Sequence, residues 1–187
     1  MEARTRRVVV SEFLSLDGVM EDPAWTFPYW NDAIAAFKGA ETNAAEALLL
    51  GRVTYEALAA VWPTSPDPGA PAINALPKHV ATTTLDAADV ARIGWNARRL
   101  DGDDAAEAVR ALKAAPGGDL LVWGSARLAQ TLLAAGLVDE LRLLVYPVVL
   151  GTGRRLFGDE TATLDLVDAR PMGSGVTALV YRPATAA

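Results

Sequence analysis

Two short segments with the same layout most constrain how this chain folds. Leu50-Gly51-Arg52-Val53-Thr54 and Trp123-Gly124-Ser125-Ala126 each join an apolar, strand-like run to a segment with helical patterning. A strand, a glycine turn and a helix in direct succession form the repeating unit of parallel α/β folds. Because parallel strands end at one edge of their sheet, we expect both helix N-termini to face a common crevice.

The rest of the chain alternates strand and helix signals around these two turns. Apolar and β-branched runs bounded by turn residues predict strands at 7–14, 47–50, 78–84, 97–100, 119–123, 140–150, 164–170 and 175–182. Helical periodicity and capping residues predict helices at 31–47, 53–61, 103–115 and 125–135. Two stretches contain several prolines. Residues 21–30 are predicted to form an ordered loop, and residues 63–77 are predicted to form a loop on the surface.

The connections between these elements indicate the kind of sheet. No helix separates the last two strands, so the C-terminal part of the sheet is expected to be antiparallel, whereas the helical connections before it predict parallel strands. A length of 187 residues is within the usual span of one domain. The sequence therefore predicts a single-domain, three-layer α/β/α fold over residues 1–187, with a mixed and mainly parallel sheet.

The residues that are missing exclude several kinds of chemistry. The chain has no cysteine and one histidine, His79. Disulfides, thiolate metal sites and cysteine nucleophiles are excluded, multi-histidine metal sites are excluded, and a Ser-His-Asp triad has only one possible base. We predict no metal. The net charge of −6 argues against nucleic-acid partners, because Lys and Arg dominate phosphate binding, and a small-molecule partner is favoured.

The N-terminal region gives no sign of export or of a membrane span. Residues 1–7 are basic, but Ser11, Glu12, Ser15 and Asp17 interrupt the apolar stretch that follows. A signal peptide needs an unbroken apolar core and a small-residue cleavage site, and no window approaches the roughly 20 apolar residues of a membrane helix. A cytoplasmic protein without a membrane partner is expected.

The two glycine turns have the features that a phosphate group requires. Gly51 and Gly124 permit close approach of a ligand, and each is followed by N–H groups at a helix N-terminus. Arg52 adds a guanidinium that can pair with phosphate oxygens and that the helix dipole would disfavour without an anion. The alternative is that both glycines only make tight turns. Two such turns favour a ligand with several phosphates, such as a dinucleotide.

The residues near these turns bear on which dinucleotide is bound. The chain has neither a G-x-G-x-x-G fingerprint nor an acidic residue placed to hold a ribose diol. Thr82, Thr83 and Thr84 instead close the strand that begins at Lys78 and offer hydroxyls to a 2′-phosphate. This pattern favours NADPH over NADH.

The turn after the first strand is a second place where chemistry is expected. Asp17-Gly18 lies at the same predicted sheet edge, and the aromatic stretch 21–30 behind it can cover a flat ring. We predict that Asp17 orients a water or the substrate and that Gly18 lies at the cofactor. The alternatives are an ordinary Asp-Gly turn and, for the aromatic residues, core packing or a dimer contact.

Three blocks together resemble a known family. VVVSEFLSLDGVMEDP, LLLGRVTYEAL and LLVWGSARLAQTLLAAGLVDELRLLVYPVVLGTGRRLF are similar, in this order, to the C-terminal reductase domain of riboflavin-pathway deaminase/reductases, a branch of the dihydrofolate-reductase fold. The resemblance covers residues 7 to 182. Any single block would be unspecific, whereas their order is specific at the family level.

The resemblance implies an NADPH cleft and a homodimer. It places the cofactor phosphates at the Gly51-Arg52-x-Thr54 turn and at the second turn, and the nicotinamide under the segment after the first strand. The residues assigned to the cofactor are Gly18, Gly51, Arg52, Thr54, Thr82, Thr83, Gly124, Ser125, Ala126, Arg127 and Leu128. Family members often have Ser-Arg where this chain has Thr82-Thr83, so the arginine expected near the 2′-phosphate is missing.

The hypothesis from sequence is therefore a reductase that transfers a hydride from NADPH to a pteridine- or pyrimidine-like small molecule. Asp32 and Glu41 are only loose counterparts of the carboxylate that binds folate in dihydrofolate reductases, so folate is poorly supported. The alternatives are a non-catalytic, ligand-binding homodimer with the same cleft, and a structural dimer. The run 141–150 is apolar enough for a dimer interface, although a buried central strand would look identical.

Overall fold

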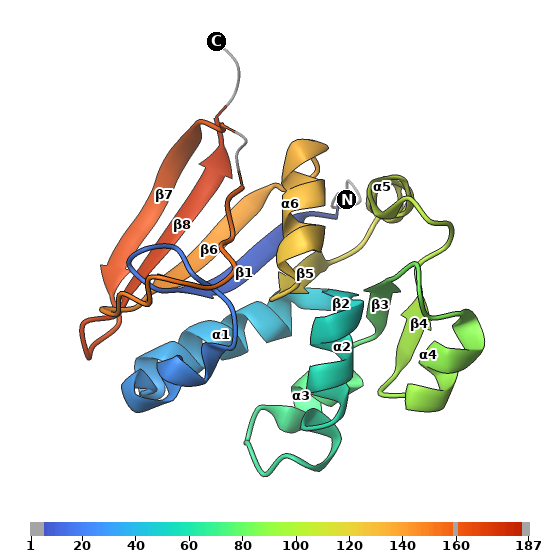
Figure 1. The fold of residues 1–187 in the computed structure, drawn as a ribbon, viewed down its shortest axis with the longest axis horizontal. Helices are drawn as coiled ribbons and strands as arrows, with labels where there is room; N and C mark the ends of the chain where they lie inside the picture. The colour runs from blue at the N-terminus through green and yellow to red at the C-terminus, as the bar shows by residue number, and fades with distance from the viewer. Residues whose placement is uncertain (1–5, 159–160, 185–187) are drawn as a thin grey trace.

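The fold is built on one eight-stranded mixed sheet. A computed structural model describes residues 6–158 and 161–184 (Figure 1), and its strands lie in the order β4-β3-β2-β5-β1-β6-β8-β7. The strands from β4 to β6 pair in parallel, and β8 joins β6 and β7 in antiparallel fashion. The predicted α/β class and the antiparallel C-terminal strands are confirmed.

The elements follow one another with short connections. The strands are β1 (Val8–Leu14), β2 (Ala45–Gly51), β3 (Lys78–Ala81), β4 (Ala97–Arg99), β5 (Asp119–Trp123), β6 (Glu140–Val145), β7 (Leu164–Pro171) and β8 (Thr177–Pro183). The α-helices are α1 (Asp32–Ala44), α2 (Arg52–Ala59), α3 (Ala70–Ala75), α4 (Ala87–Ile93), α5 (Ala105–Ala114) and α6 (Ala126–Ala134). Two further segments are 3-10 helices, η1 (Pro23–Tyr29) and η2 (Trp62–Thr64).

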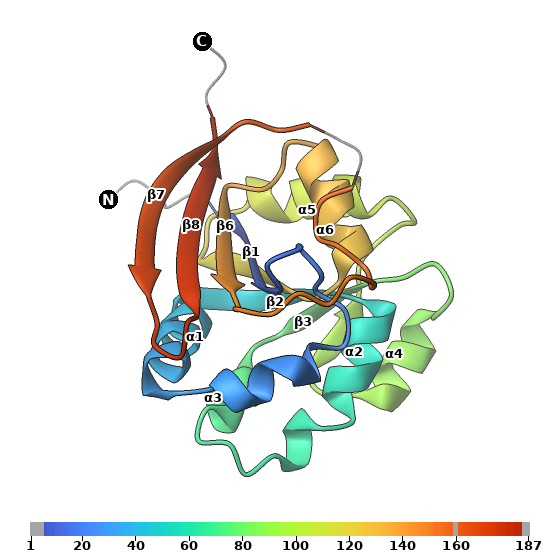
Figure 2. The ribbon, with the colours of Figure 1, turned by 60° about the vertical axis from the view of Figure 1, so that its left-hand side comes forward.

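Helices cover both faces of the sheet and form three layers (Figures 1 and 2). Helices α5 and α6 pack on one face through Val109 and Leu132. Helices α2, α3 and α4 pack on the other through Tyr55, Ile73 and Val90. On that same side, α1 covers the antiparallel strands with its apolar residues in a third cluster. Successive side chains of a strand point to opposite faces of the sheet, so each strand contributes residues to a separate core on each face.

Several predicted bounds differ from the observed ones. The helix predicted at 31–47 ends at Ala44, and residues 45–47 belong to strand β2 instead. The stretch 21–30, predicted as a loop, contains η1, whose first residues include a proline with its φ already set for a helical turn. The surface loop predicted at 63–77 contains α3 with Pro71 in its first turn. Helix α4 is not among the predicted elements, although Asp86 and Asp89 form a capping box at its start.

The first half of the apolar run 141–150 belongs to a buried central strand, β6, which ends at Val145, whereas Val149 in the second half is exposed. Strand β6 lies between β1 and β8, and Leu141 and Leu144 are almost completely buried. Strand β7 is the edge strand instead, and its Leu166 and Val167 are exposed. Within residues 6–158 and 161–184, no helix has the length and hydropathy needed to cross a membrane.

Candidate functional site

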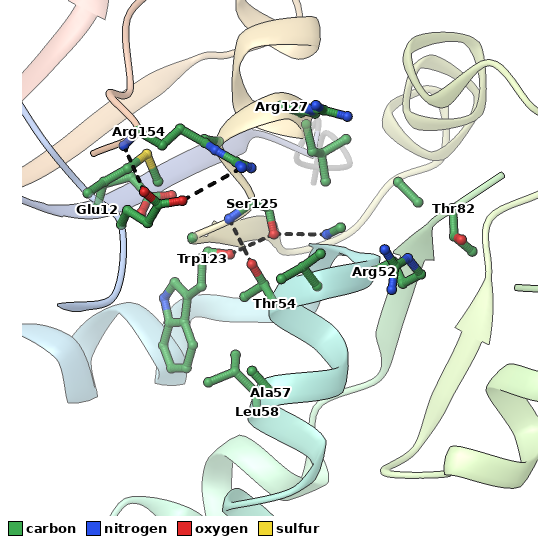
Figure 3. A pocket seen from close by; sticks show the side chains of 18 of the residues that line it. Glu12, Arg52, Thr54, Ala57, Leu58, Thr82, Trp123, Ser125, Arg127 and Arg154 are labelled. Carbon is green, nitrogen blue, oxygen red and sulfur yellow. Dashed lines mark hydrogen bonds and ion pairs between the residues drawn. The ribbon is translucent and has the colours of Figure 1, made fainter. Parts of the chain in front are cut away.

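A cavity of about 720 Å³ opens where the parallel strands β1, β2, β3 and β5 end (Figure 3). Its volume is in the range of sites for small molecules and cofactors, about 300–1,000 Å³. The topology explains its place, since consecutive strand–turn–helix units leave their turns at this edge of the sheet. Ten of the predicted cofactor residues line it: Gly51, Arg52, Thr54, Thr82, Thr83, Gly124, Ser125, Ala126, Arg127 and Leu128.

Hydrogen bonds join the two glycine turns to each other. The Gly51 N–H donates to Ser125 Oγ at 2.8 Å, and the Ser125 N–H donates to Thr54 Oγ1 at 3.0 Å. The Ser125 hydroxyl in turn donates to the Trp123 carbonyl at 3.0 Å. The N-termini of α2 and α6 are thus fixed side by side at the cavity, as Figure 3 shows.

The backbone of the second turn is in an unusual conformation. Gly124 and Ser125 both have positive φ, 53° and 59°. A Cβ atom on Gly124 would lie 3.1 Å from both Cγ2 and Oγ1 of Thr54, so a side chain there would require Thr54 to shift, and glycine avoids this crowding between the turns. Ser125 tolerates the same left-handed region at a cost of about 1–2 kcal/mol, which its three hydrogen bonds offset. Strain of this kind is concentrated at functional sites.

The first turns of both helices lack the side-chain caps that helices usually have. Gly51 before α2 has no side chain that could cap the helix, and the Ser125 side chain before α6 accepts no hydrogen bond from the helix amides that follow it. Uncapped N–H groups and the positive end of the helix dipole make each N-terminus suited to an anion. Two such ends at one cavity can bind two phosphate groups of one ligand.

Cationic side chains flank these helix ends. Arg52 and Arg127 line the cavity on either side of the joined turns (Figure 3). The Arg52 guanidinium pairs with Glu56 one helical turn away at 2.8 Å, and both side chains are about two-fifths exposed. Such an exposed pair contributes little to stability, so Arg52 can exchange it for a phosphate at little cost.

The threonines at the end of β3 lie at the far side of the same cavity. Thr82 Oγ1 accepts hydrogen bonds from the amides of Thr84 and Leu85, both at 3.1 Å, and so closes the local turn. This hydroxyl can still donate to an anion. Thr83 and Thr84 also border a neighbouring hollow that includes Arg99.

Asp17 and Gly18 do not belong to the residues that line the cavity. The Asp17 carboxylate accepts from the Ser15 hydroxyl at 2.7 Å and from the amides of Leu150 and Gly151 at 3.1 and 2.8 Å. These hydrogen bonds lower the pKa of Asp17 to about 2. Gly18 makes the tight turn that follows, with φ of 81°. This geometry corresponds to the Asp-Gly turn that was the alternative to a catalytic role.

The inner end of the cavity carries a group of polar residues that the sequence alone could not bring together. Ser11, Glu12 and Lys38 line it together with Trp123. Lys38 Nζ donates to Ser11 Oγ at 2.6 Å and pairs with Glu41 at 2.7 Å, and it lies 4.9 Å from the centre of the Trp123 ring. The signal was visible in VVVSEFL, where two polar residues interrupt a strand that is otherwise apolar.

Glu12 is the most unusual member of this group. It is 5% exposed, and burial raises the pKa of its carboxyl well above the ordinary value, although the Lys38 charge and the Gly124 amide act in the opposite direction. A buried carboxyl with a raised pKa in a cleft is a physical mark of a functional site. Among the residues that the structure places, no group of three or more His, Cys, Asp or Glu side chains could hold a metal ion.

Comparison with known proteins identifies the family. The sequence profile of the RibD C-terminal domain matches residues 6–178. The chain belongs to the RibD C-terminal domain family. Uncharacterized protein YyaP of Bacillus subtilis (strain 168) is 30% identical over 189 residues, which cover 95% of each chain. The family resemblance inferred from the three sequence blocks is therefore confirmed.

Solved structures agree with this membership at the level of the fold. A pyrimidine reductase-like protein from Corynebacterium diphtheriae has a TM-score of 0.71 at 13% identity, over 97% of this chain and 93% of that one. A deaminase/5-amino-6-(5-phosphoribosylamino)uracil reductase from Thermotoga maritima has a TM-score of 0.67 at 14% identity. There the match covers 96% of this chain and 57% of the longer protein. These similarities show that the chain shares the fold of these proteins.

Proposed function

We propose that this RibD C-terminal domain protein is an NADPH-dependent reductase that transfers a hydride to a pteridine- or pyrimidine-like small molecule. One observation carries the proposal: two helix N-termini without side-chain caps are joined by hydrogen bonds at a single cavity. A pyrophosphate-bearing cofactor offers the adjacent anionic groups that such a pair can bind. Bound NADPH would supply the hydride.

The chain's own residues have distinct tasks in this proposal. The amides of Arg52–Thr54 and of Ala126–Leu128 hold the pyrophosphate, and Arg52 and Arg127 neutralise its charge. Apolar residues of the cavity wall, among them Leu58 and Met20, exclude water from the reacting groups. The protein thus contributes positioning and a dry environment.

The names of the structural relatives support the substrate class. The protein from Thermotoga maritima is described as a uracil reductase and the one from Corynebacterium diphtheriae as pyrimidine reductase-like. A flat nitrogen heterocycle suits the inner end of the cavity, where Phe13 and Trp123 supply aromatic surface beside Ser11 and Lys38.

Titration with NADPH and with NADH tests the proposal. We expect tryptophan fluorescence to change on NADPH binding, because Trp123 lies at the cavity. NADPH should bind more tightly than NADH, because the threonines after β3 offer hydroxyls to a 2′-phosphate. Absence of binding by either nucleotide would contradict the proposal and favour a structural protein. Binding of NADPH without its oxidation by pteridines or aminouracils would support the non-catalytic, ligand-binding alternative.

Removing either of the two cavity arginines beside the glycine turns, Arg52 and Arg127, is expected to weaken NADPH binding. Each charge-assisted hydrogen bond to phosphate contributes about 1.5–3 kcal/mol, so Arg52→Ala and Arg127→Ala should each raise the Kd by about tenfold or more. Isothermal titration calorimetry measures this directly. Arg110→Ala, which removes an exposed arginine of α5 outside the cavity lining, is the matched control and should leave the Kd within twofold.

We also propose that the protein is a homodimer that associates through β7. This edge strand has a free pairing side, and the exposed Leu166 and Val167 extend an apolar surface along it. Sedimentation equilibrium is expected to give twice the chain mass of 19.7 kDa, and Leu166→Asp is expected to shift the protein toward the monomer. A wild-type protein with the mass of one chain at all concentrations would contradict this proposal.

A further inference from the structure

Glu12 places a buried carboxyl in the wall of the cavity. It lies on β1, opposite Leu143 of β6, and next to Ser11, which pairs with Trp123 of β5. The side chain is directed to the inner end of the cavity, and its Oε1 has no hydrogen-bond partner among the residues that the structure describes. An unpaired polar atom at this depth costs about 1–3 kcal/mol, so its retention calls for a role outside folding.

The other carboxyls that line the cavity differ from Glu12. Glu21, Asp22 and Asp103 are all exposed. Glu21 accepts from the Arg154 amide at 3.2 Å, and Asp103 pairs with Arg99 at 2.6 Å. Among the cavity-lining acids that the structure describes, Glu12 is therefore the one that is both buried and without a cationic partner in direct contact.

The charged groups around Glu12 determine its protonation. Helix α1 brings Lys38 and Glu41 to it, and these two already pair with each other at 2.7 Å. The Gly124 amide donates to it from the β5–α6 turn, and the residue opposite on β6 is apolar. Beyond them, Glu21 and Arg154 form their own pair across the cavity mouth. Burial dominates, so the pKa of Glu12 is raised well above its ordinary value and the protonated carboxyl is favoured.

We propose that Glu12 is the proton donor of the reduction. This inference rests on the proposed function and adds a catalytic residue to it. When a C=N bond of the substrate is reduced, its carbon gains the hydride supplied by NADPH and its nitrogen gains the proton of the Glu12 carboxyl. NADPH becomes NADP⁺, Glu12 becomes a carboxylate, and a proton from water restores the acid before the next turnover.

The ionisation of Glu12 can be measured without any substrate. Carbon-13 NMR of protein labelled at the glutamate carboxyls, recorded across pH for wild type and Glu12→Gln, assigns the Glu12 signal by its absence from the variant. We expect one carboxyl that titrates well above the other glutamates in wild type and is missing from Glu12→Gln. A Glu12 signal that titrates near pH 4, as exposed glutamates do, would overturn the proposal.

Turnover supplies the second test, with NADPH and 7,8-dihydropterin or an aminouracil as probes. Glu12→Gln keeps the shape of the side chain but has no acidic proton, so kcat is expected to fall 100-fold or more while the Kd for NADPH stays within threefold. In wild type, kcat should fall as pH rises through the Glu12 pKa, and this limb should be absent from Glu12→Gln. Glu12→Asp should recover part of the activity.

The outcomes separate this proposal from the proposed function. A Glu12→Gln protein with wild-type kcat and an unchanged pH profile would overturn the role of Glu12 and leave the reductase intact. Wild-type protein that does not bind NADPH would overturn both. Glu107→Gln, a change of the same kind at an exposed residue of α5, is the control and should leave kcat and its pH profile unchanged.

Discussion

Gly124→Ala is expected to raise the Kd for NADPH at least tenfold and to lower the free energy of unfolding by about 1–3 kcal/mol. Gly124 has φ of 53°, and the added methyl group would lie 3.1 Å from two atoms of Thr54. Relief of that contact has to separate Thr54 from the second turn and lengthen the Ser125 N–H to Thr54 Oγ1 hydrogen bond. The N-termini of α2 and α6 would then no longer be fixed side by side.

Gly136→Ala is the matched control for this change. Gly136 follows α6 with φ of 64°, but an added Cβ there meets no atom within 4 Å. The variant should therefore lose about 1 kcal/mol of stability from its backbone conformation and keep wild-type affinity for NADPH. Calorimetric titration and chemical denaturation of both variants measure the two effects separately. Equal losses of affinity in the two variants would show that the contact with Thr54 has no special part in binding.

Glu140→Gln is expected to lower the free energy of unfolding by about 2–4 kcal/mol. The Glu140 carboxylate lies at the start of β6, opposite the cavity edge of the sheet, and its side chain is 4% exposed. It accepts from Arg142 at 2.7 Å, from Arg182 at 3.0 Å and from Arg7 at 3.1 Å. A neutral amide in this place would leave three guanidinium groups close together without the negative charge between them. Urea denaturation measures the loss.

The pH dependence of stability provides a second test of the interaction between Glu140 and its three arginine partners. Burial raises the pKa of Glu140, but the hydrogen bonds from Arg142 and Arg182 and the charge of Arg7 outweigh it and lower the pKa below 4.5. A carboxyl whose pKa is lower in the folded protein than in the unfolded chain stabilises the fold fully at pH values above its unfolded-state pKa. This stabilisation is lost as the pH falls through its folded-state pKa. Wild type should therefore lose stability below about pH 4.5 more steeply than Glu140→Gln. The exposed Glu107→Gln should cost less than about 0.5 kcal/mol.

The sequence predicted the fold where local and long-range signals agree. Strand β5 has the predicted bounds, because Gly117 and Gly118 end the preceding segment and Gly124 begins the next turn. The end of β6 at Val145 was predicted too late, since the apolar run continues beyond the last residue that pairs with β1 and β8. Pairing partners decide where a strand ends, and a sequence does not name them.

The parts of the candidate site that are formed by backbone groups could be predicted from the sequence. Glycine turns before helices are local features, so the residues around Gly51 and Gly124 were found without a structure. The role of Glu12 could not be assigned from the sequence, because it depends on burial and on Lys38 of a helix some 26 positions later along the chain. The hydrogen-bond partners of Asp17, Leu150 and Gly151, could not be inferred from the sequence either, since they lie far away along the chain.

Amide NMR spectra recorded during an NADPH titration test whether the paired helix N-termini bind the cofactor. Changes in the ¹H–¹⁵N signals are expected to be largest for Gly51 to Thr54 and for Gly124 to Leu128, and to be much smaller with NADPH added to Gly124→Ala at the same concentration. Changes confined to other parts of the sheet, or no change at millimolar NADPH, would contradict the assignment of these two turns as the pyrophosphate site.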